Sequence, residues 1–130
     1  MANYRYDHIH LMSPDPLKTA QFYEQMFDAK KNDVRELPDG RTSVSLDLNG
    51  SNILIVHPKA HPAPTQGSPE NNYGLEHFGL ITDNIDTAVK ELKAKGVQFK
   101  QEITVPRPGL RIAYLWAPEN VLIELVERTH

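Results

Sequence analysis

Apolar and polar positions alternate over several short stretches of the chain, with two longer stretches of helical periodicity between them. The alternation is clearest at residues 43–48, where Val44, Leu46 and Leu48 face one side and polar residues face the other. Eight strands are predicted, at residues 5–12, 31–37, 43–48, 52–57, 75–81, 97–105, 110–116 and 121–127. Helices are predicted to follow the first and the fifth strand, so the order β-α-β-β-β occurs twice.

The predicted helices have recognisable start and stop signals. Asp15 is suited to cap the first helix, and Pro16 is suited to its first position. This helix should run to about Phe27. Its buried residues should be Leu17, Ala20, Phe22 or Tyr23, and Phe27. Asp83 or Asn84 is suited to cap the second helix, and Gly96 to end it, with Ile85, Ala88, Val89 and Leu92 on its buried stripe. These signals strengthen the interpretation of the chain as one motif written twice.

The chain is accordingly predicted to be a single α+β domain, residues 1–130, built of two tandem β-α-β-β-β modules. The modules span about residues 5–57 and 75–128. Residues 58–74 carry four prolines and are predicted to form an irregular connector that shapes the rim of a site.

Composition narrows the classes of function. The net charge is −3 without a basic cluster, which disfavours nucleic acid as a partner. No apolar run approaches the ~20 residues that cross a membrane, and the first five residues lack an apolar signal segment, so a cytoplasmic location is expected. The absence of cysteine excludes disulfides, thiolate metal sites and cysteine nucleophiles.

Two histidines occupy equivalent places in the two modules. His8 opens the pattern His-Ile-His-Leu and His77 opens His-Phe-Gly-Leu, and each pattern precedes an aspartate-marked helix start. This repetition suggests one metal ion held between two halves. Glu124, inside the apolar run 121–126, is a candidate third ligand, because a carboxylate there is costly unless it is paired or coordinated. Alternatively, the histidines are structural or solvated and Glu124 faces water on an edge strand.

Several short motifs, in this order and spacing, give the chain a family resemblance. It resembles the vicinal oxygen chelate superfamily, which includes glyoxalase I, bleomycin resistance proteins, fosfomycin resistance enzymes, methylmalonyl-CoA epimerases and extradiol dioxygenases. The resemblance covers nearly the whole chain. Its motifs are His8-x-x-Leu11 with Asp15, Phe22-Tyr23, Gly74-Leu75-Glu76-His77, Gly96, and Ala117-Pro118-Glu119-Asn120 before Ile123-Glu124-Leu125.

The resemblance implies a curled mixed sheet made of two half-barrels, with the helices on its outer face. It places one divalent metal on His8, His77 and Glu124. Leu54 stands where glyoxalase I has a glutamate and the epimerases have a glutamine or a similar ligand. The implied site therefore has three protein ligands instead of four.

Two imidazoles and one carboxylate leave up to three metal positions open, an arrangement that suits iron(II) and oxygen chemistry. Fe²⁺ is the expected metal, with Zn²⁺, Ni²⁺ and Mn²⁺ as alternatives. Tyr114 matches the tyrosine that extradiol dioxygenases place on the strand before the glutamate ligand. His10 shares a strand face with His8 and could replace the acid–base histidine of those enzymes. Both are candidate catalytic residues.

The expected protein is a metal-dependent enzyme that chelates a small substrate through neighbouring oxygens. It would be an extradiol-type dioxygenase or a glyoxalase-like lyase or isomerase. Two alternatives stay open: a non-catalytic protein that sequesters an antibiotic, and a fosfomycin-type thiol transferase whose manganese acts as a Lewis acid. The resemblance also implies a homodimer, domain-swapped or not.

Overall fold

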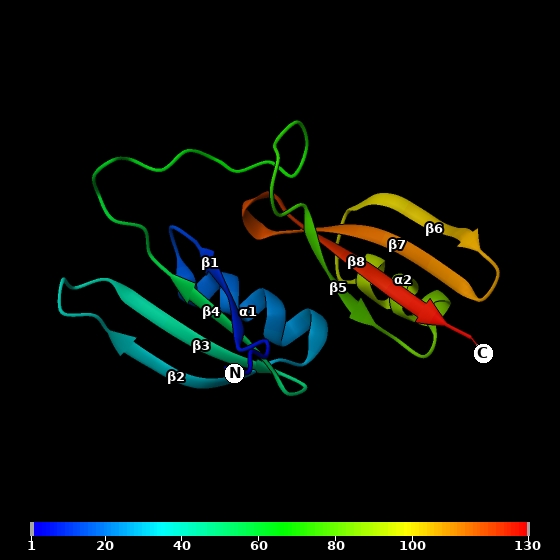
Figure 1. Ribbon diagram of the computed structural model, residues 1–130, viewed down its shortest axis with the longest axis horizontal. Coiled ribbons are helices and arrows are strands. Elements are labelled where there is room, and N and C mark those ends of the chain that lie inside the picture. Colours follow the sequence, from blue (N-terminus) through cyan, green and yellow to red (C-terminus); the bar gives the residue numbers. More distant parts are fainter. Residues whose placement is uncertain (1, 130) are drawn as a thin grey trace. The chain divides into compact units, whose positions relative to one another are not determined.

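A computed structural model describes residues 2–129 (Figure 1). The predicted element order is confirmed. The elements are β1 (His8–Met12), α1 (Pro16–Phe27), β2 (Lys30–Glu36), β3 (Thr42–Leu48), β4 (Ser51–Val56), β5 (His77–Ile81), α2 (Ile85–Ala94), β6 (Phe99–Arg107), β7 (Leu110–Ala117), a short 3-10 turn (Pro118–Asn120) and β8 (Val121–Arg128). Between β4 and β5 the chain has no helix or strand.

The chain divides into two compact units, with the boundary between Thr65 and Gln66. The strand order is β1-β4-β3-β2 in the first unit and β5-β8-β7-β6 in the second. In each sheet the first two strands of that order run parallel and the other neighbours run antiparallel. Each sheet is mixed, four-stranded and open, and each unit repeats the predicted β-α-β-β-β order.

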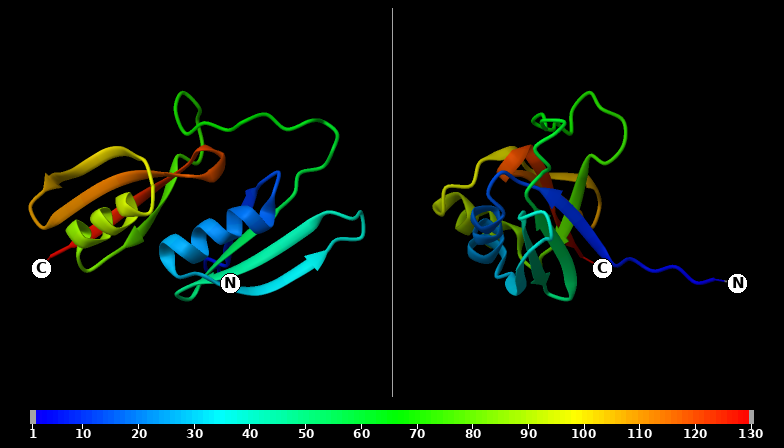
Figure 2. Two further views of the ribbon diagram at one scale, coloured as in Figure 1. Left: turned by 180° about the vertical axis from the view of Figure 1, so that it is seen from behind. Right: turned by 90° about the vertical axis from the view of Figure 1, so that its left-hand side faces the viewer.

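One helix packs on one face of each sheet (Figure 2). In the first unit α1 buries Ala20 and Tyr23, and the sheet buries Val44 and Leu46. In the second unit the buried residues are Ile85, Val89 and Leu92 of α2, with Ala113, Leu115, Ile123 and Leu125 of the sheet. The opposite face of each sheet is not covered by the helix of its own unit.

The predicted caps explain where the helices begin and end. Asp15 Oδ1 accepts a hydrogen bond from the Lys18 amide at 3.1 Å, and Asn84 Oδ1 accepts one from the Thr87 amide at 3.1 Å. Asn84, one of the two candidates, is therefore the cap of α2. Gly96 follows α2 at φ +91°, a conformation that favours glycine.

Two expectations about α1 and β1 were wrong. Leu17 was expected in the core but is 46% exposed, because the buried stripe of α1 passes through Pro16, Thr19, Ala20 and Tyr23. Residues 5–7 were expected in the first strand, which instead begins at His8, opposite Asn52 near the start of β4. No helix among residues 2–129 is both long and apolar enough to cross a bilayer.

Candidate metal centre

The sheet face of the second unit opposite α2 gathers three of the predicted site residues. Tyr114 on β7 lies directly opposite Glu124 on β8, so their side chains share a face. On the other side of β8, Gly79 of β5 lies opposite Glu124, and His77 lies two residues before Gly79. His77, Tyr114 and Glu124 therefore come from three adjacent strands and point to the same side of the sheet.

The two carboxylate oxygens of Glu124 have different neighbours. The Tyr114 hydroxyl donates a hydrogen bond to Oε2 at 3.0 Å. Oε1 lies 3.6 Å from His77 Nε2, which is beyond hydrogen-bond distance. The rings of His77 and Tyr114 meet edge to face, with centroids 5.1 Å apart. The Glu124 side chain is 19% exposed and that of His77 26%, so both are accessible from solvent but partly shielded.

Tyr114 is a hydrogen-bond donor to Glu124 in this arrangement. Its pKa is raised above the ordinary 10.0, first by desolvation and then by its hydrogen bond to Glu124 and the negative charges of Glu124 and Glu76. The hydroxyl is therefore protonated at neutral pH and can orient the carboxylate.

Gly79 leaves room for the Glu124 carboxylate. A Cβ atom at Gly79 would lie 3.5 Å from Glu124 Oε1 and 3.7 Å from Val126. Both distances are ordinary van der Waals contacts, so an alanine would touch the carboxylate without a clash, and Gly79 leaves this space open. The glycine was visible in the His-Phe-Gly-Leu pattern, but the sequence alone did not show which side chain it accommodates.

Glu76 also contacts His77, although a strand over residues 75–81, as predicted, would turn these two neighbouring side chains to opposite faces. Its Oε1 lies 3.0 Å from His77 Nδ1. Glu76 precedes the first residue of β5, so the alternation of side chains along a strand does not govern its direction. This contact occupies Nδ1 and leaves Nε2 directed toward Glu124.

The first unit holds the counterparts of these residues. His8 on β1 pairs with Asn52, as His77 pairs with Leu122 in the second unit. His10 lies opposite Leu54, which in turn lies opposite Ser45. Leu54 thus occupies the register position of Glu124, in agreement with the place that the family resemblance gives it.

The two units consequently offer different side chains at equivalent positions. Where the second unit has Gly79, Glu124 and Tyr114, the first has His10, Leu54 and Ser45. The His8 and His10 rings lie beside each other, with centroids 6.1 Å apart. Among these candidate site positions, the histidine at the start of the first strand is the same in both units.

Two of the three predicted metal ligands, His77 and Glu124, therefore lie together, and His8 belongs to the other unit. Within the part of the chain that the structure describes, no three His, Asp or Glu side chains form a ready-made metal cage. The donor atoms nevertheless fit a divalent ion. Imidazole nitrogen and carboxylate oxygen bind such ions at about 2.0–2.2 Å, and two ligands of one ion then lie roughly 3–4 Å apart. The 3.6 Å between Nε2 and Oε1 is within that range.

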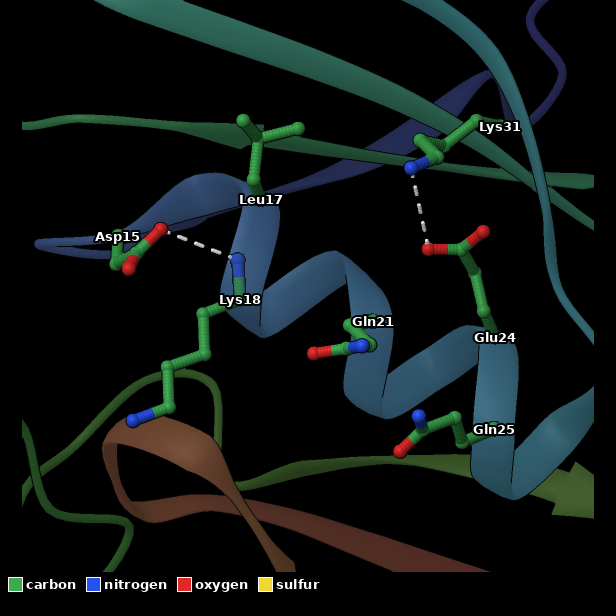
Figure 3. A pocket seen from close by; sticks show the side chains of 7 residues that line it. All are labelled: Asp15, Leu17, Lys18, Gln21, Glu24, Gln25 and Lys31. Atoms are coloured by element: carbon green, nitrogen blue, oxygen red, sulfur yellow. Dashed lines mark hydrogen bonds and ion pairs between the residues drawn. The ribbon is translucent and has the colours of Figure 1, made fainter.

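A separate hollow lies along the solvent side of α1 (Figure 3). It is lined by Asp15, Leu17, Lys18, Gln21, Glu24, Gln25 and Lys31. Asp15 already caps the helix, and Glu24 forms an ion pair with Lys31 at 3.6 Å. None of the predicted site residues lines this hollow, so it is not the candidate centre.

The chain belongs to the Glyoxalase/Bleomycin resistance protein/Dioxygenase superfamily, whose model matches residues 5–125. This agrees with the resemblance found from the motifs and with the repeated fold. The family includes several chemistries, so membership does not by itself define a reaction.

Among curated proteins, the human mitochondrial methylmalonyl-CoA epimerase is 28% identical over 93% of this chain and 72% of its own length. Protein YwkD of Bacillus subtilis is 30% identical over 93% of this chain and 94% of its own length. Lactoylglutathione lyase of Schizosaccharomyces pombe is 26% identical over 99% of this chain but only 49% of its own length.

Solved structures share the fold at lower identity. A glyoxalase family protein from Bacillus cereus has a TM-score of 0.81 at 16% identity, covering 100% of this chain and 97% of that one. A mutant of the fosfomycin resistance protein FosX from Listeria monocytogenes, complexed with Mn(II) and 1S,2S-dihydroxypropylphosphonic acid, has a TM-score of 0.76 at 23% identity, covering 98% of this chain and 95% of that one.

Proposed function

We propose that this protein is a metal-dependent enzyme that binds a small substrate with two neighbouring oxygen atoms. His77 and Glu124 are two of the metal ligands, and His8, from the same chain or from a second copy, is the third. The observation that carries the proposal is the approach of His77 Nε2 to Glu124 Oε1 at 3.6 Å. Because Nδ1 of His77 faces Glu76, Nε2 can direct its lone pair toward Oε1 of Glu124, and a cation stabilises two such donor atoms.

The chain's own residues have distinct tasks in this proposal. Tyr114 holds one oxygen of Glu124 through its hydrogen bond, which leaves the other oxygen directed toward His77. Gly79 keeps the space beside that oxygen free. When bound, a divalent metal would supply Lewis acidity toward the substrate's oxygens. Fe²⁺ is the first candidate for this metal, and Zn²⁺, Ni²⁺ and Mn²⁺ are the alternatives.

Two reaction classes fit this arrangement, and each has its own support. Isomerase- or lyase-type proton transfer is supported by the epimerase and lyase among the relatives. Extradiol-type oxygenation is supported by Leu54 in the register position of Glu124, which leaves three candidate ligands, and by the tyrosine beside the glutamate. His10, two residues after His8 on the same strand face, is the candidate acid–base group for the second class.

A substrate panel tests the proposal. Protein loaded separately with Fe²⁺, Mn²⁺, Zn²⁺ or Ni²⁺ is incubated with catechols under an oxygen electrode, with methylglyoxal–thiol hemithioacetal, and with methylmalonyl-CoA in deuterated water. Oxygen uptake supports the dioxygenase. Turnover of the hemithioacetal, or deuterium at the carbon between the two carbonyl groups, supports the proton-transfer class. Turnover should disappear in Glu124→Gln and persist in the surface variant His57→Ala.

Absence of all turnover, together with metal-independent retention of an antibiotic, would contradict the enzyme proposal and indicate a sequestering protein. Thiol addition to fosfomycin in the presence of Mn²⁺ would instead assign the transferase alternative.

A further inference from the structure

Each candidate histidine ligand is preceded in the chain by a carboxylate residue that contacts its ring. Asp7 Oδ2 lies 2.7 Å from His8 Nδ1, and Glu76 Oε1 lies 3.0 Å from His77 Nδ1. The two contacts occur at equivalent positions of the two units, immediately before β1 and β5. The units differ at the positions of Glu124, Tyr114 and Gly79 but share this carboxylate–histidine pair.

The pairing defines which ring nitrogen carries the proton. An ionised carboxylate only accepts hydrogen bonds, so in each pair Nδ1 is the donor. In a neutral imidazole the other nitrogen, Nε2, then carries the lone pair. For His77 this agrees with the second contact of the ring, because Nε2 lies 3.6 Å from Glu124 Oε1 and makes no hydrogen bond to it.

The start of each strand makes this contact possible. His8 and His77 are the first residues of their strands, so Asp7 and Glu76 lie outside the ladder. Their side chains can turn toward the following ring instead of pointing to the opposite face. The two carboxylate side chains are 86% and 63% exposed, so they are not needed to fill a core.

We infer that Asp7 and Glu76 are a repeated pair of positioning residues, which hold His8 and His77 as Nδ1–H tautomers and present Nε2 of each ring as the metal ligand. Carboxylates in this role orient a ligating imidazole and raise its basicity. The choice of tautomer is a property of the metal-free protein. Its consequence for metal binding rests on the proposed function.

The experiment is nitrogen-15 NMR of the histidine rings in metal-free protein, at a pH about two units above the ordinary imidazole pKa. In the parent protein His8 and His77 should show the Nδ1–H pattern. Asp7→Ala should shift His8 alone, and Glu76→Ala should shift His77 alone, toward the Nε2–H form. His57 is an internal reference, because its Nδ1 lies 2.8 Å from the Pro58 carbonyl oxygen, and its pattern should stay the same in all variants.

A matched control is Glu70→Ala, which removes an exposed carboxylate paired with Lys100 at 2.8 Å. It should leave all histidine tautomers unchanged. Titration of each protein with Mn²⁺ against a competing chelator gives the second readout. Asp7→Ala and Glu76→Ala should each weaken Mn²⁺ binding by roughly 10- to 100-fold, the usual effect of removing such a partner, whereas Glu70→Ala should not.

Unchanged tautomers in Asp7→Ala and Glu76→Ala would overturn the inference, whatever the metal data show. If Mn²⁺ binding is unaffected although the tautomers shift, the positioning role for the metal is overturned. If the parent protein binds no metal but the tautomers shift as expected, the proposed function fails and the tautomer assignment stands. The two ideas are thereby tested separately.

Discussion

Glu127 should be the most important polar side chain for the stability of the second unit. It is only 8% exposed, and its Oε2 accepts a hydrogen bond from the Ile85 amide at 2.8 Å, at the first residue of α2. Its Oε1 lies 3.3 Å from Arg111 Nη1. The first unit needs no such acceptor at the start of its helix, because the first residue of α1 is Pro16, which has no amide hydrogen.

The expected loss can be worked out from these contacts. Glu127→Ala leaves the buried Ile85 amide without an acceptor, which costs about 1–3 kcal/mol. It also removes a negative charge from the N-terminus of a helix, which costs a further ~0.3–1 kcal/mol. The free energy of unfolding should therefore fall by about 1.3–4 kcal/mol, and Tm by roughly 5–15 °C for a chain of this length. Glu127→Gln keeps an acceptor for the amide and should lose about 1 kcal/mol.

Urea denaturation followed by circular dichroism measures both variants against the parent protein. Asp86→Asn is the control, because it removes the other partner of Arg111, an exposed carboxylate, without affecting the Ile85 amide. It should destabilise the protein least. Equal losses in Glu127→Ala and Glu127→Gln would refute the reasoning, since the amide acceptor would then be irrelevant.

Three further predictions concern single side chains. Tyr23→Phe should raise the free energy of unfolding by about 1 kcal/mol, and the urea midpoint with it, because it removes a buried hydroxyl that has no partner in the described structure; a lower midpoint would contradict this. The hydrogen bonds from Arg111 lower the pKa of Asp86 below its usual 3.8. The ion pair between Asp86 and Arg111 therefore stabilises the protein fully above pH 3.8, and this stabilisation is lost as the pH falls through the lowered pKa of Asp86. Asp86→Asn should remove this fall of the urea midpoint at acid pH. Tyr114→Phe should keep metal binding but reduce kcat, because Glu124 loses a donor; an unchanged kcat would refute its role.

The fold could be predicted because both halves carry the same alternation and the same cap signals. Val44, Leu46 and Leu48 share the buried face, and Asn49 and Gly50, a pair typical of two-residue hairpin turns, form a tight turn with φ of 50° and 95°. The ends of elements were less predictable. Residues before His8 continue the apolar alternation, but a strand needs a partner, and β4 begins only at Ser51.

Part of the candidate site could also be predicted. Tyr114 and Glu124 are ten residues apart around the turn Pro118–Asn120, so the hairpin register brings them opposite each other. The contacts of Asp7 and Glu76 with the following histidines could not be predicted, because these side chains lie outside the ladder, where the alternation rule does not apply.

The central claim is that His77 and Glu124 bind a divalent metal together with His8. The most direct test is the metal content of purified protein after loading with Mn²⁺ or Fe²⁺ and desalting, measured by inductively coupled plasma mass spectrometry. The account predicts about one ion per chain in the parent protein and in His57→Ala, with three ligands per ion, and loss of the ion in His8→Ala, His77→Ala and Glu124→Ala. Equal metal content in the parent protein and His77→Ala would contradict it.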